Sequence, residues 1–221
     1  MGKYKSIAVI YGSDSSEWEV SCRSGEYVAS RMDETAYDIY EIFARFGKWD
    51  LVAMRKRNSM RVTFSEGAQP EVDKSDFSVK IYGEKVKFDY AYIVQHGFPG
   101  ETGHLQGYLE MLGVPFSSCS AFVSSVVFDK YACKSYVRGA DPVKCAPELF
   151  IRKGDDVEAV ARKAAETLSF PVFVKPTSGG SSFGITRVTE PEAHRMLQQY
   201  AMNHGVRMTE YAAQIIREDG G

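Results

Sequence analysis

Residues 170–185 constrain the fold most, because two strand-like runs flank a loop rich in glycine and serine. The first run is apolar and ends on Lys175, and Pro176 then stops the strand pattern since it has no N–H to donate to a sheet. The loop supplies backbone N–H and hydroxyl donors close to this lysine, which suits a phosphate group. In a P-loop the lysine follows the glycines and opens a helix, so this is a different arrangement. An ordinary β-hairpin with a glycine-rich tip fits the local sequence equally well.

The start of the chain predicts an α/β domain. Residues 7–11 form an apolar run typical of a buried parallel strand, Gly12 begins a turn, and residues 17–32 carry apolar side chains at helical spacing. No G-x-G-x-x-G fingerprint is present, so a dinucleotide is not indicated. Glu17 lies in the first helical turn, where the helix dipole favours an acid, and helix capping is therefore its simplest explanation.

A second candidate loop follows the strand predicted at residues 88–94. Residues 95–103 contain three glycines and a proline directly after that strand. Open α/β sheets bind ligands beyond the carboxyl ends of their strands. His96 and Glu101 flank this loop as candidate acid–base partners. The alternative is that His96 only bonds a local backbone group.

The remaining pattern predicts elements of ordinary length. A small antiparallel insertion is expected within residues 55–87. Further strands are predicted at residues 37–43, 47–53 and 147–152, and helices at residues 105–112, 120–140, 156–168, 196–203 and 208–218. Lys130 and Lys134 would lie one turn apart on the helix at 120–140, either as a solvated face or as ligands of a phosphate.

Bulk composition excludes several classes of protein. The 221 residues are 44% hydrophobic and 25% charged, as in an ordinary globular protein, and the net charge of −2 gives no strong attraction to nucleic acid or membrane. No apolar run is long enough for a transmembrane helix. The four cysteines form no C-x-x-C pair, which argues against a zinc site and suits reduced thiols in the cytoplasm.

Four motifs, taken in order, resemble the D-alanine–D-alanine ligase family of the ATP-grasp superfamily. They are the strand–turn–helix start that contains Glu17, the segment His96-Gly-x-x-Gly-Glu-x-Gly-x-x-Gln-Gly, the motif Asp129-Lys130-x-x-x-Lys134, and the loop at residues 170–185. The resemblance covers about residues 5 to 189.

The resemblance implies an α/β fold in three parts. Residues 1–119 would form an N-terminal doubly wound parallel-sheet (pre-ATP-grasp) domain, and residues 120–190 an α+β small subdomain of the ATP-grasp. Residues 191–221 resemble the helices that end the family's C-terminal domain, as though its catalytic middle were excised near residues 189–192. The adenine-binding strand and the carboxylates that bind Mg²⁺ are not recognisable, so the ATP-grasp is expected to be incomplete and no metal ligand is assigned.

The resemblance also implies roles for individual residues. Glu17 matches the acid that holds the ammonium of the first D-alanine, Ser181 matches the serine that bonds this glutamate, and His96 matches a histidine beside the substrate. Lys130 and Lys175 match lysines that contact the ATP phosphates. The glycine-rich loop over those phosphates corresponds to Gly180, Ser181 and Ser182.

The implied activity is ATP-dependent joining of two D-alanines through an acylphosphate, with Mg²⁺. It would take place in the cytoplasm and serve peptidoglycan precursor synthesis, and through it cell shape. A homodimer is expected, and neither nucleic acid nor membrane is an expected partner. Two alternatives stay open because the Mg²⁺ ligands are not recognised. The chain is either a truncated non-catalytic remnant or binding module that retains part of the substrate pocket, or a partial version of a longer enzyme.

Overall fold

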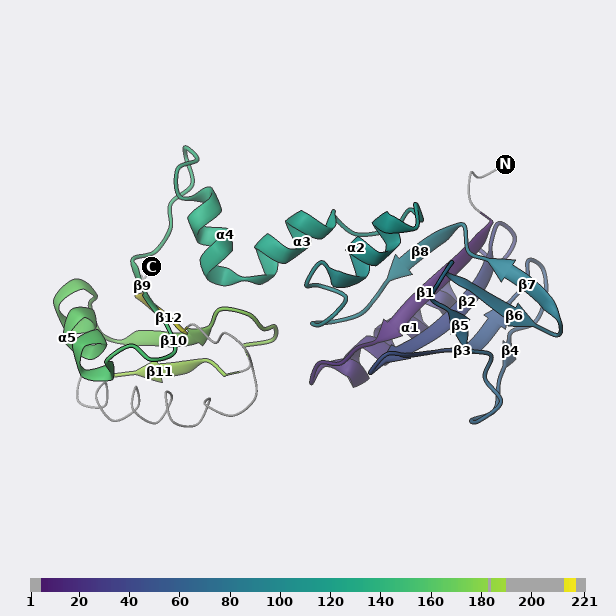
Figure 1. Ribbon diagram of the computed structural model, residues 1–221, viewed down its shortest axis with the longest axis horizontal. Helices are drawn as coiled ribbons and strands as arrows, with labels where there is room; N and C mark the ends of the chain where they lie inside the picture. The colour runs from purple at the N-terminus through teal and green to yellow at the C-terminus, as the bar shows by residue number, and fades with distance from the viewer. Residues whose placement is uncertain (1–4, 183, 190–212, 218–221) are drawn as a thin grey trace. The chain divides into compact units, whose positions relative to one another are not determined.

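The computed structural model describes residues 5–182, 184–189 and 213–217. It divides into two compact units, Met1–Ser125 and Val126–Gly221, and each unit is described by itself (Figure 1). The sequence predicts the first boundary at 119/120, and the units instead meet at 125/126, within a helix.

The first unit is built on a five-stranded sheet with the order β4–β3–β2–β1–β8. Its strands are β1 (Ser6–Gly12), β2 (Asp38–Arg45), β3 (Lys48–Arg55), β4 (Val62–Thr63) and β8 (Tyr90–Ile93). β1 runs parallel to β2 and β8, whereas β3 is antiparallel to β2 and to β4. The parallel sheet expected from the sequence is therefore its central part, and two antiparallel strands extend it.

Apolar side chains cover both faces of this sheet, as in a doubly wound fold. On one face α1 (Trp18–Arg31) packs against alternate residues of β1 and β2. On the other, α2 (His104–Met111) contributes Leu105 and Leu109 to the larger core. That core also takes in the small sheet of β5 (Val72–Asp73), β6 (Ser78–Ile81) and β7 (Glu84–Lys87), through buried Phe77 and Val79. The predicted antiparallel insertion is confirmed, and it is part of the core.

A glycine allows α1 to lie directly on β1. A Cβ atom at Gly25 would stand 2.2 Å from the Tyr11 ring and 2.6 Å from its Cβ. We expect Gly25→Ala to lower the free energy of unfolding by about 1–3 kcal/mol, because the added methyl overpacks the helix–strand contact. Chemical denaturation measures this loss. Gly107→Ala on α2 is the matched control, since its Cβ would be 3.7 Å from the nearest atom, and an equal loss in both variants would contradict the packing argument.

The second unit holds a four-stranded antiparallel sheet with the order β11–β10–β12–β9. Its strands are β9 (Glu148–Ile151), β10 (Val172–Pro176), β11 (Thr186–Val188) and β12 (Ala213–Arg217). α5 (Val157–Thr167) packs on one face and buries Ala161 and Ala164 against Val172 and Val174. The predicted hairpin across residues 170–188 is confirmed by the antiparallel pairing of β10 with β11.

The helix predicted at residues 208–218 is wrong for 213–217. These residues form β12, which lies between β10 and β9 and pairs with both. The β-branched pair Ile215 and Ile216 suits a central strand, and pairing on both sides outweighs the local helical spacing. The helix predicted at 196–203 lies outside the described residues.

The single helix predicted at residues 120–140 is two helices, α3 (Ala121–Phe128) and α4 (Lys130–Val137). Asp129 interrupts them with an extended backbone, at φ −87° and ψ 112°. Its carboxylate accepts a hydrogen bond from the backbone N–H of Ala132 and so caps α4, and its backbone forms a bridge with Ser178. The capping carboxylate, rather than apolar spacing, thus decides where the second helix begins.

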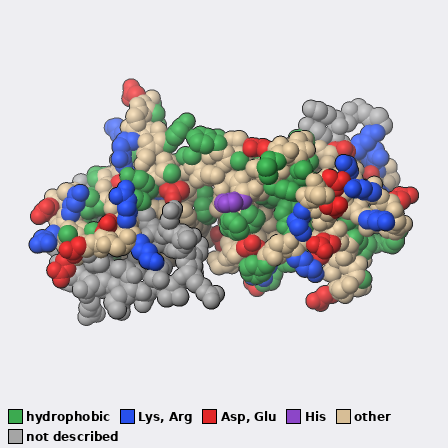
Figure 2. All heavy atoms as spheres, in the orientation of Figure 1, with side chains coloured by type: hydrophobic (Ala, Val, Ile, Leu, Met, Phe, Trp, Pro, Cys, Tyr) green, Lys and Arg blue, Asp and Glu red, His purple; other side chains and the backbone are tan. Residues whose placement is uncertain are grey.

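No described helix has the length and apolar character needed to cross a membrane. On the face drawn in Figure 2, the basic and acidic side chains that are coloured lie interspersed, as the net charge of −2 suggests.

Candidate functional site

In the first unit, hydrogen bonds join the carboxyl ends of β1, β2 and β8. The Ser21 hydroxyl accepts from the Gly12 N–H at 3.1 Å and donates to the Val94 carbonyl at 2.7 Å. The Ala44 carbonyl accepts from the Ser13 N–H and from the Gln95 side-chain amide, both at 3.0 Å. The loops after β1 and β8 are therefore held next to each other, at the sheet edge where the sequence predicts a ligand.

Glu17 stands at the N-cap position of α1 and is half-buried. The structure thus places Glu17 at the helix start, as the sequence predicts, and its side chain makes no capping hydrogen bond; the helix dipole is what favours an acid there. Its backbone N–H donates to the Ser15 hydroxyl at 3.1 Å. The loop after β1 thus holds the main chain of Glu17 in place at the start of α1.

His96 lies half-buried in the loop after β8, and its carbonyl accepts a hydrogen bond from the Ser15 hydroxyl at 2.7 Å. The Glu101 carboxylate accepts from the Gly97 N–H at 2.6 Å. Glu101 therefore holds the loop closed through the backbone. Its role as the acid–base partner of His96 stays a prediction.

Buried polar residues that the sequence argument missed support this loop. Gln106 is fully buried on α2, and its amide nitrogen donates to the Gly100 carbonyl at 2.5 Å and to the Ser118 hydroxyl at 3.2 Å. Gln95 is 5% exposed at the end of β8. An amide immediately after an apolar strand, and another on the apolar face of a helix, are the sequence signals that could have found them.

In the second unit, Lys130 joins the start of α4 to the glycine-rich loop. Its backbone N–H donates to the Thr177 carbonyl and its ammonium donates to the Gly179 carbonyl, both at 2.8 Å. The Ser178 hydroxyl donates to Asp129 at 3.4 Å. A lysine predicted to contact phosphate is thereby held against the loop predicted to cover it.

Lys130 and Lys175 lie near enough to affect each other. Burial lowers the pKa of Lys130, the positive charge of Lys175 lowers it further, and Asp129 offsets part of the effect. The Lys175 ammonium stands 5.7 Å from the centre of the Phe173 ring. Lys130 is thus partly desolvated beside a second cation, and Asp129 compensates it only in part, so an anion would stabilise this site.

The loop between β10 and β11 has an unusual backbone. Ser181 and Ser182 are both in the left-handed region, at φ 46° and 59°, where residues other than glycine are uncommon. Gly184 is also left-handed, at φ 73°, and a Cβ there would be 3.0 Å from the Pro176 side chain. Such conformations concentrate at ligand-binding loops, which suits the predicted role of this one.

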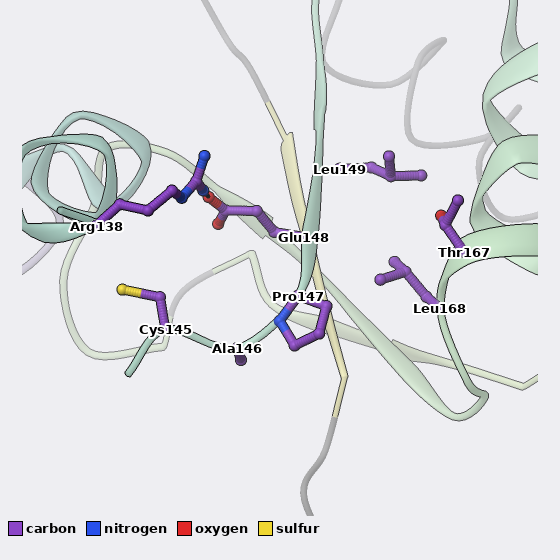
Figure 3. Close-up of a pocket in the computed structure, with 8 residues that line it drawn as sticks. All are labelled: Arg138, Cys145, Ala146, Pro147, Glu148, Leu149, Thr167 and Leu168. Atoms are coloured by element: carbon purple, nitrogen blue, oxygen red, sulfur yellow. Dashed lines mark hydrogen bonds and ion pairs between the residues drawn. The ribbon is translucent and has the colours of Figure 1, made fainter. Parts of the chain in front are cut away.

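Lys134, the second lysine of the motif Asp129-Lys130-x-x-x-Lys134, pairs with a carboxylate outside the glycine-rich loop. Its ammonium lies 2.7 Å from the carboxylate of Glu148, whose side chain is 5% exposed, and donates to the Ala146 carbonyl at 2.9 Å. Arg138 also bonds Glu148, beside Cys145, in the wall of a cavity of about 550 Å³ (Figure 3). Lys134 is therefore neither a solvated lysine nor a phosphate ligand in this structure. It neutralises a buried carboxylate.

These features define the class of protein: an α/β domain with two hydrogen-bonded loops beyond its parallel strands, and an α+β unit that fits part of an ATP-grasp. Residues 6–119 match the family model described as D-ala D-ala ligase N-terminus. The chain therefore belongs to the D-alanine–D-alanine ligase family. A second model, described as an ANTAR domain, matches residues 184–216, and within that range the described segments with regular structure are strands β11 and part of β12.

Curated relatives carry the same family name. The D-alanine–D-alanine ligase of Phocaeicola vulgatus is 38% identical over 188 residues, which cover 85% of this chain and 54% of the relative. That of Parabacteroides distasonis is 41% identical over 192 residues, with 86% and 53% covered. The chain thus spans about half the length of the curated relatives it matches.

Solved structures show the same fold. D-alanyl-alanine synthetase A from Vibrio cholerae matches with a TM-score of 0.75 at 22% identity, over 99% of this chain and 60% of that one. The D-alanine–D-alanine ligase from Bacillus anthracis matches with a TM-score of 0.68 at 26% identity, over 98% and 58%. Both matches extend over the two units of this chain.

Proposed function

We propose that this chain supplies the first-substrate loops and the phosphate-binding half of an ATP-dependent D-alanine–D-alanine ligase. The observation that carries the proposal is the half-buried pair Lys130 and Lys175 beside a left-handed serine loop, in a member of this family. One solved relative, from Bacillus anthracis, is described as complexed with ATP.

In this proposal the two lysines hold the ATP phosphates, and Gly180, Ser181 and Ser182 cover them with backbone and hydroxyl donors. ATP supplies the phosphoryl group that activates the carboxylate of the first D-alanine. The amine of a second D-alanine then displaces phosphate from the acylphosphate. The positive charge of the lysines stabilises the negative charge that spreads over the transferred group.

The first unit would bind the first D-alanine. Glu17 pairs with its ammonium, and His96 lies beside it in the loop after β8. Ser181, in the second unit, would help to orient the substrates. Each of these roles comes from the family motif.

Mg²⁺ enters the proposal only as the ion that accompanies ATP. Within the described residues, no group of three histidine, cysteine, aspartate or glutamate side chains could hold a metal ion. The wider role is synthesis of peptidoglycan precursors in the cytoplasm, by a homodimer.

The direct test is phosphate release from ATP by the purified 221-residue chain with Mg²⁺ and D-alanine, in parallel with calorimetric titration of each substrate. We expect micromolar-to-millimolar binding of ATP and of D-alanine, and turnover that Lys175→Ala abolishes, in this chain or in a longer polypeptide that contains it. Binding of D-alanine without turnover in either protein would favour the non-catalytic binding module. Binding of neither substrate would overturn the proposed function.

A further inference from the structure

The Ser15 hydroxyl joins the two loops of the first unit. It donates to the His96 carbonyl at 2.7 Å and accepts from the Glu17 N–H at 3.1 Å. Its third contact is the Ser13 hydroxyl at 3.0 Å. A serine hydroxyl has one donor and two acceptor positions. Since the donor is directed at His96, Ser13 must donate to Ser15, and the hydrogen-bonding capacity of Ser15 is then fully used.

Close packing keeps the two loops in this arrangement. Gly97 has φ 73°, and a Cβ at this residue would stand 2.7 Å from the Ser15 Cβ. On the other side of Gly97, the Glu101 carboxylate accepts from its N–H at 2.6 Å. The backbone after His96 is therefore held between Ser15 and Glu101, and neither side chain is free to move without breaking a short hydrogen bond.

We propose that Ser15 is a positioning residue, which keeps the start of α1 and the His96 loop in one fixed relation so that Glu17 stays aimed at the ammonium of the D-amino acid. This inference rests on the proposed function. The contacts of Ser15 are with main-chain atoms and with Ser13, so it acts through Glu17 and His96 and not on the substrate. Neither the spacing of the motif nor the helix pattern distinguishes Ser15 from its exposed neighbour Ser16.

The test compares Ser15→Ala with Ser16→Ala, the matched control, by calorimetric titration with D-alanine and with propionate, which lacks the ammonium. For Ser15→Ala we expect about tenfold weaker binding of D-alanine, because the main chain of Glu17 loses the hydrogen bond that holds it in place. Its preference for D-alanine over propionate should fall by a similar factor. ATP affinity should stay unchanged, since the lysines belong to the second unit. Ser16→Ala should behave as the wild type in all three titrations.

A ligand-free measurement shows whether the hydrogen bond itself is lost. Amide hydrogen exchange at Glu17, followed by NMR, should be about tenfold faster in Ser15→Ala than in Ser16→Ala. Faster exchange with an unchanged preference for D-alanine over propionate would reduce Ser15 to a structural role and overturn the inference. Unchanged exchange would overturn it as well. A wild-type chain that binds no D-alanine would instead overturn the part of the proposed function on which this inference rests, the binding of the first D-alanine by the first unit.

Discussion

Lys175→Ala is expected to weaken ATP binding about 10- to 100-fold, because hydrogen bonds to charged groups contribute about 1.5–3 kcal/mol each. Lys175 is half-buried at the end of β10, and its charge already lowers the pKa of Lys130. A thermal-shift or calorimetric titration with ATP measures the loss. Lys163→Ala, at an exposed position on α5, is the control that removes the same charge from the same unit.

The pH dependence of ATP binding is a second test of the pair Lys130 and Lys175. Neutral Lys130 cannot attract phosphate, so ATP affinity should fall as the pH rises through the pKa of Lys130, which burial and Lys175 lower from its ordinary value. Lys175→Ala removes one cause of the lowering, so the fall should move to higher pH. An ATP affinity that changes equally in Lys175→Ala and Lys163→Ala would contradict a phosphate site at these lysines.

Arg61→Ala is expected to lower the free energy of unfolding by about 1–3 kcal/mol, because it leaves the buried Glu41 carboxylate without its cation, which is itself 46% exposed. The Glu41 side chain is 4% exposed, and Arg61 bonds both of its oxygens, at 2.6 and 2.8 Å. The Tyr11 hydroxyl donates to the same carboxylate at 3.3 Å, and burial together with the Glu41 charge raises the pKa of Tyr11. Tyr11 alone cannot replace the lost charge.

Two further variants show whether the Glu41–Arg61 pair differs from an ordinary surface ion pair. Lys74→Ala breaks the exposed pair with Glu71, and its effect should stay within about 0.5 kcal/mol. The double variant Glu41→Leu with Arg61→Leu should be more stable than Arg61→Ala, since no unpaired charge remains. Denaturant unfolding measures all three. A double variant no more stable than Arg61→Ala would show that the cost lies in packing rather than in the buried charge.

Local pattern was sufficient for much of the fold. The apolar run at residues 7–11 is one strand that ends in turn residues, and the hairpin at 170–188 is two short strands joined by turn residues. Both were predicted close to their observed bounds. Helices α2 and α5 were predicted within one or two residues. These elements need no distant partner to be recognised, because their side-chain periodicity and end residues agree.

Two predictions failed where distant residues decide the structure. Residues 213–217 have helical spacing, but pairing with β9 and β10 makes them a strand. Asp129 divides the helix at 120–140: its carboxylate caps α4, and its backbone pairs with Ser178, about fifty residues further along the chain. Neither partner is visible in a local window of sequence.

The sequence by itself determined the class of fold and the family, and it selected the lysines, glycines and serines proposed to bind phosphate, because these depend on residue type and spacing. Only the tertiary structure decided how the polar groups are used. It paired Lys134 with buried Glu148, turned Glu101 onto the Gly97 N–H, and directed the Ser15 hydroxyl to both Glu17 and His96. The physical reason is that a buried polar group must find a partner, and which partner lies within reach is a property of the folded chain.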